Sequence, residues 1–439
     1  MRDKMTKIRA VLFIYLTFQA GIAQALQLKD LIAEVVENNL EIQKMQYELE
    51  SDHQSFLSSQ HLPHTSLDLY GGAGAQRNYD YTSISDKDLD KYSAGIVLTH
   101  KLFDGHFADS EIDRHKASFS AKSFLLESEA ENITLDTIEL FLEILKLDQI
   151  SNLSTEFLGE LNLIIELSNK KLDSGVLNTT DHALVLLAYD IARNNEINAF
   201  NNLKAKISLY EKIVGSAPPI SMMKYKDIED DELPKSLSIA LEMANQNHPV
   251  LFACKEHIKE AKAQYDGSFS KDYPGVEFEL SADWHKNMKN TQKRERTVSA
   301  MININYNLLG SNNNAHYNDQ YRYLVSQAET NCKIKEREVS SSMKLSFNAL
   351  ELIELSQRYL NEAKNKSSTI AKSYIERSEV ETISFEKLIQ RSNQKLETEI
   401  MEIETQYDLL FTKFRVLHSM GSLLKHFGIT EYHDHVHNR

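Results

Sequence analysis

The chain has little cysteine and little proline, and after residue 25 no apolar run long enough to cross a bilayer as a helix. Its 439 residues contain two cysteines, Cys254 and Cys332, which are too few for a disulfide framework. The two could pair in an oxidising compartment, but the sequence favours two unpaired residues on helices. Without an apolar run of roughly 18 residues, any membrane crossing by the mature chain has to be made by strands.

The N-terminus has the order of a secretory signal peptide. Basic residues in the first nine positions precede an apolar run at 11–18 and the small-x-small sequence Ala23-Gln24-Ala25. This order predicts export, with residues 1–25 removed after Ala25, and the run is too short to span a bilayer. Because no cysteine follows the cleavage site, a lipid anchor there is not expected.

Composition and motifs exclude several classes of function. The formal net charge is −15, which disfavours binding to nucleic acid. The sequence has no HExxH, GxSxG, paired CxxC or nucleotide-binding fingerprint, so neither an enzyme nor a bound cofactor is predicted. Three histidines spaced by two in the tail 429–439 would suit a transition metal, but short tails of this kind are usually incidental, and no metal site is predicted.

All prolines lie outside two long stretches, 106–214 and 315–420. Because proline breaks helices, its absence there permits very long ones. Apolar residues also recur at alternating steps of four and three, which indicates coiled-coil packing. The longest such series is Leu396, Ile400, Ile403, Tyr407, Leu410, Phe414 and Leu417.

Four short segments alternate apolar and polar residues and predict strands at 66–77, 91–101, 275–285 and 296–308. In 276–284 the apolar residues fall on one face and Glu277, Glu279 and Asp283 on the other. Such strands fit a soluble sandwich or a transmembrane barrel. Four strands cannot close a barrel, and open edges are not tolerated in lipid, so a membrane protein would need several copies of the chain.

The order of elements repeats after roughly 200 residues. Residues 28–42 match 237–251, and each is followed by two predicted strands and two long helices. We therefore predict a first repeat at 26–220 and a second at 221–428.

Several short motifs give the chain its resemblance to one family. They are the helix starts LKDLIAEVVENN and LSIALEMANQN, the turns Leu102-Phe103-Asp104-Gly105 and Leu308-Leu309-Gly310-Ser311, the hairpin Lys171-Leu172-Asp173-Ser174-Gly175 with Asn178 and Asp181, and the returns Val214-Gly215 and Met420-Gly421. In this order and at these spacings, the sequence resembles the TolC-like outer-membrane efflux proteins over about 27–428.

The resemblance implies a mainly α fold with a small β part. Long coiled-coil helical hairpins would form a periplasmic tube, and four strands per chain would contribute to a twelve-stranded barrel in a homotrimer in the outer membrane. It also implies passive export, or type I secretion, of small molecules or unfolded proteins. The implied partners are outer-membrane lipid, a periplasmic adaptor and an inner-membrane transporter of the ABC or RND type. The alternative is a secreted or periplasmic coiled-coil scaffold or adhesin without a pore.

The resemblance also suggests where functional residues lie. A closed aperture is expected near the helical hairpins, held by hydrogen bonds and ion pairs among Asp173, Asp181, Tyr374, Glu376, Arg377, Glu379 and Glu381. Arg377 with Asp173 or Asp181 is the first pair to test, since arginine can make two bonds to one carboxylate. Adaptor contact is expected at the hairpin turn Gly175, Val176, Leu177 and Asn178. The second hairpin has Arg377 at the position of Gly175 and Ile383 at that of Asp181, so it is expected to turn differently. If the apolar strand faces meet lipid, Glu277, Glu279 and Asp283 line the pore and favour cations.

Overall fold

The computed structural model describes residues 26–60, 65–78, 87–225, 227–228, 232–287, 294–307, 311–380 and 384–429. The signal peptide, most of the histidine-containing tail, and the turn residues 308–310 lie outside these ranges. The chain forms two compact units. Unit 1 comprises Met1–Gln43, Ser128–His248 and Val339–Arg439, and unit 2 comprises Lys44–Glu127 and Pro249–Glu338. Each unit therefore takes segments from both predicted repeats, and the repeats themselves stay a prediction.

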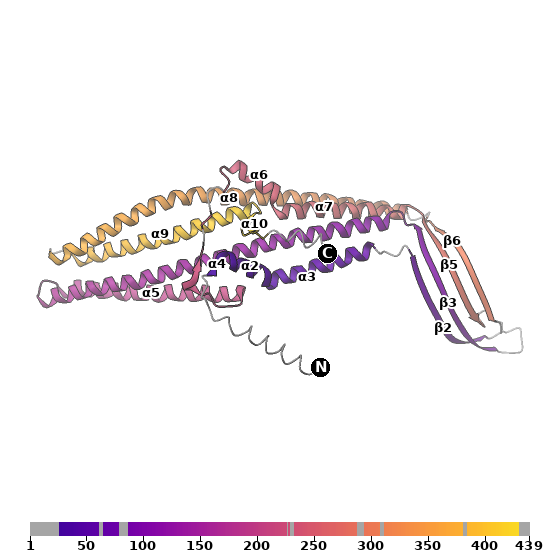
Figure 1. Ribbon diagram of the computed structural model, residues 1–439, viewed down its shortest axis with the longest axis horizontal. Coiled ribbons are helices and arrows are strands. Elements are labelled where there is room, and N and C mark those ends of the chain that lie inside the picture. Colours follow the sequence, from indigo (N-terminus) through magenta and orange to yellow (C-terminus); the bar gives the residue numbers. More distant parts are fainter. Residues whose placement is uncertain are drawn as a thin grey trace, which may run out of the picture. The chain divides into compact units, whose positions relative to one another are not determined.

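Most of the described chain is helical (Figure 1). The long helices are α4 (Phe107–Asp173), α5 (Thr179–Val214), α8 (Ser311–Val380) and α9 (Phe385–Ser419). The shorter ones are α2 (Leu28–Asn38), α3 (Leu40–Gln60), α6 (Leu237–Asn247), α7 (Pro249–Ser268), α10 (Leu423–His426) and the 3-10 turns η1 (Ile220–Met222) and η2 (Phe269–Asp272). All four long helices lie within the proline-poor stretches except for the first residues of α8. Among the described residues, no helix is both long and apolar enough to cross a membrane.

Four long strands form one antiparallel sheet in unit 2. They are β2 (Thr65–Asn78), β3 (Lys87–Phe103), β5 (Gly275–Lys286) and β6 (Arg294–Asn305), in the spatial order β2-β3-β5-β6 (Figure 1). Each predicted strand is found within a few residues of its expected bounds. In unit 1, the short β1 (Leu26–Gln27) pairs in parallel with β4 (Met223–Lys224).

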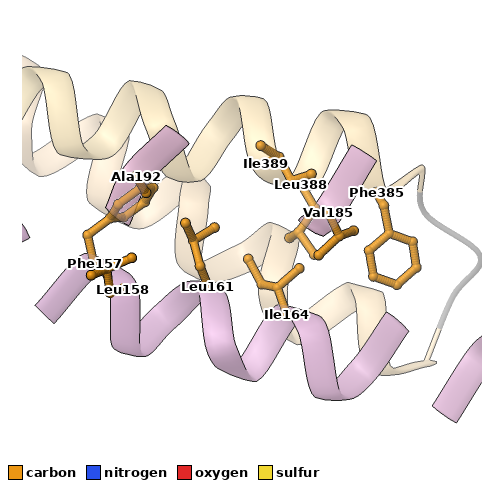
Figure 2. Close-up of a cluster of buried hydrophobic side chains, with 9 residues drawn as sticks. All are labelled: Phe157, Leu158, Leu161, Ile164, Val185, Ala192, Phe385, Leu388 and Ile389. Atoms are coloured by element: carbon orange, nitrogen blue, oxygen red, sulfur yellow. The ribbon is translucent and has the colours of Figure 1, made fainter. Parts of the chain in front are cut away.

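The core of unit 1 includes a cluster where α4, α5 and α9 meet (Figure 2). Its members are Phe157, Leu158, Leu161 and Ile164 of α4, Val185 and Ala192 of α5, and Phe385, Leu388 and Ile389 of α9. The α4 residues recur at steps of three and four, which places them on one face of the helix. Further along α9, Tyr407, Leu410, Phe414 and Leu417 are also buried, as the heptad series predicts.

Unit 2 contains a disulfide between Cys254 of α7 and Cys332 of α8, with 5.1 Å between the two Cα atoms. The sequence expectation that both cysteines are unpaired was wrong. The two are 78 residues apart in the sequence, and only the packing of α7 against α8 brings them together. Sequence spacing alone carries no such information.

Two half-buried histidines are expected to make the stability of unit 1 depend on pH. Burial lowers the pKa of His248, and of His418 on α9, to about 4, and the Nε2 atom of His418 lies 3.0 Å from Oδ1 of Asn132. Both pKa values fall below the value of about 6.5 for an unfolded histidine, so the unfolded chain binds more protons between pH 6.5 and 4. Unfolding should therefore become easier as the pH falls through this window.

We expect the guanidinium unfolding midpoint, followed by far-ultraviolet circular dichroism, to fall between pH 7 and pH 4. In the double variant His248→Gln, His418→Gln the fall should be smaller. The exposed His257→Gln variant serves as a control and should keep the full dependence. An identical pH profile in the double variant and the wild-type protein would contradict this assignment.

Candidate functional site

The sheet has one apolar face that runs without interruption across all four strands. The register aligns Leu67, Leu98, Leu280 and Ala300 in one row, and Leu69, Ile96, Ala282 and Val298 in the next. These rows are not covered within the described chain: Leu67 is 65% exposed, Leu69 83% and Val298 77%. A continuous uncovered apolar surface of this kind is typical of a site that contacts lipid or another protein.

The opposite face is polar and carries the three carboxylates that the sequence assigned to a pore. Glu279 accepts a hydrogen bond of 3.2 Å from Nδ2 of Asn303, and Asp283 accepts one from the Tyr70 hydroxyl. Glu277 lies opposite Lys101 in the register. The structure therefore places Glu277, Glu279 and Asp283 on one face. Each has a hydrogen-bond or register partner on a neighbouring strand or the next one, which the sequence did not indicate.

Gly95 makes the contact between Tyr70 and Asp283 possible. Tyr70 of β2 and Asp283 of β5 are both register partners of Gly95, which lies between them on β3. A Cβ atom on Gly95 would lie 2.6 Å from Oδ1 of Asp283 and 2.7 Å from the Tyr70 ring. Sequence reasoning missed this arrangement, because the alternation within one strand does not reveal which residues are opposite on the next. A glycine inside an alternating strand is the only local signal for it.

The turn from β3 into α4 and the ends of α5 and α9 have the geometry that the motifs predict, whereas the turn at 308–310 lies outside the described residues. The carboxylate of Asp104 accepts hydrogen bonds from the backbone N–H groups of Phe107 (3.1 Å) and Ala108 (3.0 Å), and so caps the start of α4. At the other ends, α5 stops before Gly215 and α9 just before Gly421, with positive φ angles of 84° and 66°.

The first helical hairpin ends in a left-handed glycine turn. Gly175 has φ +71°, and the N–H groups of Val176 and Leu177 donate to the Lys171 carbonyl at 2.9 and 3.0 Å. Asn178 then caps α5, because its Oδ1 accepts from the Asp181 backbone N–H at 2.7 Å. The predicted hairpin turn 175–178 is thus a capped, hydrogen-bonded element with Gly175 and Val176 exposed.

The second hairpin turns differently, as the missing glycine predicts. Helix α4 ends two residues before Gly175, whereas α8 continues past Arg377 to Val380. Arginine resists the left-handed conformation, so the helix does not end at the equivalent position. Glu381 lies outside the described residues, as does the side chain of Glu379.

The remaining aperture residues lie near the end of each hairpin. Asp173 is the last residue of α4 and is exposed, as are Glu376 and Arg377 on α8. Tyr374 packs against the core cluster, and the Arg391 guanidinium lies 5.9 Å from the centre of its ring. The pairing of Arg377 with Asp173 or Asp181 stays a prediction.

Lys171 provides a link between the two hairpins that the sequence did not indicate. Its Nζ atom donates to the Ser378 carbonyl of α8 at 2.7 Å and lies 5.9 Å from the centre of the Phe385 ring of α9. One α4 side chain therefore contacts both helices of the second hairpin. In the sequence Lys171 stands out only as part of a motif, and a lysine at a helix end gives no signal of a distant partner.

Two glycines of the first hairpin should respond oppositely to alanine. Gly175→Ala puts a Cβ atom on a left-handed residue and should lower the free energy of unfolding by about 1 kcal/mol. Gly159 lies inside α4, where an added Cβ atom would have no neighbouring atom within 4 Å, so Gly159→Ala should raise it by about 0.5–1 kcal/mol. Guanidinium unfolding of the two variants under the same conditions measures both signs. Equal shifts in the same direction would contradict the left-handed assignment.

Comparison with known proteins gives one kind of match. No protein-family model matches the sequence, and no curated protein does. Solved structures do match. The Campylobacter jejuni CmeC outer membrane channel has a TM-score of 0.79 at 11% identity, covering 90% of this chain and 86% of that one. The Vibrio cholerae outer membrane protein VceC has a TM-score of 0.76 at 10% identity, with 90% and 96% covered. The Neisseria gonorrhoeae MtrE outer membrane channel has a TM-score of 0.72 at 12% identity, with 90% and 89% covered.

Each match covers about 90% of this chain. The matched part includes both the long helical hairpins and the four-stranded sheet. The matches confirm the resemblance that the short motifs predict: the chain has the fold of the TolC-like outer-membrane channels.

Proposed function

We propose that the chain is one subunit of a passive export channel in the outer membrane. The observation that carries this proposal is the two-faced sheet, which has an uncovered apolar face on one side and a polar face with carboxylates on the other. Along β5 the apolar residues run from Val276 to Trp284, or about 27 Å at 3.4 Å per residue. These nine residues fall within the roughly 9–11 that a tilted transmembrane strand needs to cross a bilayer.

The two edges of the sheet require more than one copy of the chain. Strands β2 and β6 each have one neighbour in the described chain, so each has a row of backbone groups without a strand partner. Unpaired groups of this kind are costly in lipid. In a homotrimer, β6 of one copy pairs with β2 of the next, and twelve strands close one barrel. The long helices then continue the duct through the periplasm.

Charges on the polar face give the proposed pore its selectivity. Three copies bring nine carboxylates from Glu277, Glu279 and Asp283 into the lumen, against six cations from Lys91 and Lys101 on the same face of β3. A surplus of negative charge in a narrow water-filled passage favours cations. Tyr70 and Asn303 hold two of the carboxylates in place by hydrogen bonds.

The helical hairpins are the proposed contact for a periplasmic adaptor, which would connect the channel to an inner-membrane transporter of the ABC or RND type. The exposed turn at Gly175–Asn178 is a compact, capped element suited to docking. The exported molecules belong to the class of small compounds or unfolded proteins, and co-purification of the adaptor and transporter would identify which.

Recording from the purified full chain in planar bilayers tests the function. We expect trimers by chemical cross-linking, discrete conductance steps and a reversal potential on the cation side under a salt gradient. Glu277→Gln, Glu279→Gln, Asp283→Gln should shift that potential toward zero. A monomer that stays soluble without detergent and gives no conductance would refute the proposal and favour the coiled-coil scaffold.

Arg377→Ala tests the closed aperture. If Arg377 pairs with Asp173 or Asp181 to hold the hairpins together, the variant should raise the mean single-channel conductance several-fold, because one contact that narrows the passage is lost. Lys372→Ala, which removes an exposed charge of the same sign on α8, should leave the conductance unchanged. Equal conductance in the Arg377 variant and the wild-type protein would remove Arg377 from the aperture.

A further inference from the structure

The apolar face of the sheet ends in lysine and arginine side chains at one end only, where they accompany tyrosine and tryptophan. Toward the β2–β3 and β5–β6 turns, the row of leucine, isoleucine and valine gives way to Ala94, Trp284 and Arg296, which are register partners. The next row consists of Tyr92, Lys286 and Arg294. Because side chains alternate between faces, all of these residues lie on the apolar face.

The opposite end of the same face has no such border. There, the rows are His100 with Phe278 and Ile302, and Val276 with Ile304. Neither row contains a lysine or an arginine. The cations therefore mark one boundary of the apolar face. This boundary is at the strand turns, and the long helices begin beyond the opposite ends of the strands.

The basic residues are placed unfavourably with respect to one another. Lys286 and Arg294 are directly opposite on neighbouring strands, where two like charges destabilise a sheet. Arg296 lies on the same face two residues along β6, and both arginines are exposed. Within the part of the chain that the structure describes, neither arginine has a carboxylate partner. The nearest acidic residue on this face of β3 is Asp90, two residues from Tyr92, and its backbone carbonyl accepts a hydrogen bond from Asn287.

The aromatic residues indicate at which level of the membrane the three cations lie. The Nζ atom of Lys286 lies 5.3 Å from the centre of the Tyr92 ring, and Trp284 is in the adjacent row. Tyrosine and tryptophan concentrate at the boundary between hydrocarbon and headgroups. Lysine and arginine just beyond them extend their charged ends into the headgroup layer. Three cations at this level match a ligand that has an acyl region and phosphate groups.

We propose that Lys286, Arg294 and Arg296, bordered by Tyr92 and Trp284, bind the phosphate groups of the phosphorylated glycolipid in the outer leaflet of the membrane. This inference rests on the proposed function, since that function places the apolar face in lipid and the strand turns outside the cell. Arginine suits phosphate because its planar guanidinium can donate two parallel hydrogen bonds to it. Bound phosphate would also relieve the repulsion between Lys286 and Arg294.

The test measures binding of purified diphosphoryl lipid A to the full chain in detergent, by native mass spectrometry. The variant Lys286→Gln, Arg294→Gln, Arg296→Gln should bind it at least about tenfold more weakly, since cations near a lipid surface attract its anionic headgroups. The control variant Lys333→Gln, Lys335→Gln, Arg337→Gln removes the same charge from α8 and should bind as the wild-type protein does. Dephosphorylated lipid A should bind the wild-type protein and both variants with equal, weaker affinity. Inorganic phosphate at millimolar concentration should not displace the bound lipid.

Two results would overturn the proposal. One is equal binding of diphosphoryl lipid A to the triple variant and the control variant. The other, which does not depend on the folding of any variant, is equal binding of phosphorylated and dephosphorylated lipid to the wild-type protein. Conductance recorded on the same preparations separates this from the proposed function: channels that conduct but ignore the phosphates refute only the lipid site.

Discussion

The double variant Cys254→Ser, Cys332→Ser is expected to be one of the two variants that lose the most stability. The disulfide closes a loop with a sequence separation of 78 residues. A disulfide that closes a loop of this length lowers the entropy of the unfolded chain, and so raises the free energy of unfolding by about 4.5 kcal/mol. The guanidinium midpoint of the double variant, measured by circular dichroism at 222 nm, should fall accordingly.

Reduction supplies the control for this experiment. Dithiothreitol should lower the midpoint of the wild-type protein toward that of the double variant, and should leave the double variant unchanged. Gel mobility under non-reducing conditions reports the bond directly. A wild-type protein that reacts with a thiol reagent when denatured without reductant would show that the two cysteines are not paired.

Leu161→Ala is the second large effect that we expect. Leu161 is fully buried at 0% exposure, among side chains from α4, α5 and α9 (Figure 2). Loss of three carbon atoms from a closely packed cluster leaves a cavity that the surrounding helices fill only in part, and costs about 3–5 kcal/mol. The variant should therefore unfold at a much lower denaturant concentration.

Leu163 provides a matched control two residues along the same helix. It is 67% exposed, so Leu163→Ala removes the same atoms from a side chain that the single chain leaves uncovered. Its effect on the monomer should stay below about 0.5 kcal/mol. A large loss that occurs only in the cross-linked oligomer would locate a contact between copies at this position. A small loss in Leu161→Ala would contradict the packing of the three helices.

Local patterns were enough to predict the secondary structure. Strict alternation predicted the strand at 275–285, which the structure has at Gly275–Lys286, because one shifted residue would move every apolar side chain to the other face. The lack of proline and the four-and-three steps predicted long helices within 106–214 and 315–420, where α4, α5, α8 and α9 are found. Short motifs then indicated a fold that the structural matches confirm at about 10–12% identity.

What the sequence could not give is the pairing of distant residues. Tyr70, Gly95 and Asp283 come from three strands, and their contact depends on the register between strands. The same holds for Lys171 with Ser378, and for the two cysteines. Arg377 lies between these two cases. Its identity predicted that the second hairpin lacks the glycine turn, but the sequence did not predict how far α8 continues beyond it.

The disulfide also has a topological consequence. Strands β5 and β6 both lie between Cys254 and Cys332 in the sequence, so the bond encloses this whole hairpin in a covalent ring. A single proteolytic cut between β5 and β6 would leave one molecule rather than two fragments, until a reductant opened the ring. In the proposed channel, whose strand turns lie outside the cell, the ring would keep both halves of a subunit cut by a protease attached to each other.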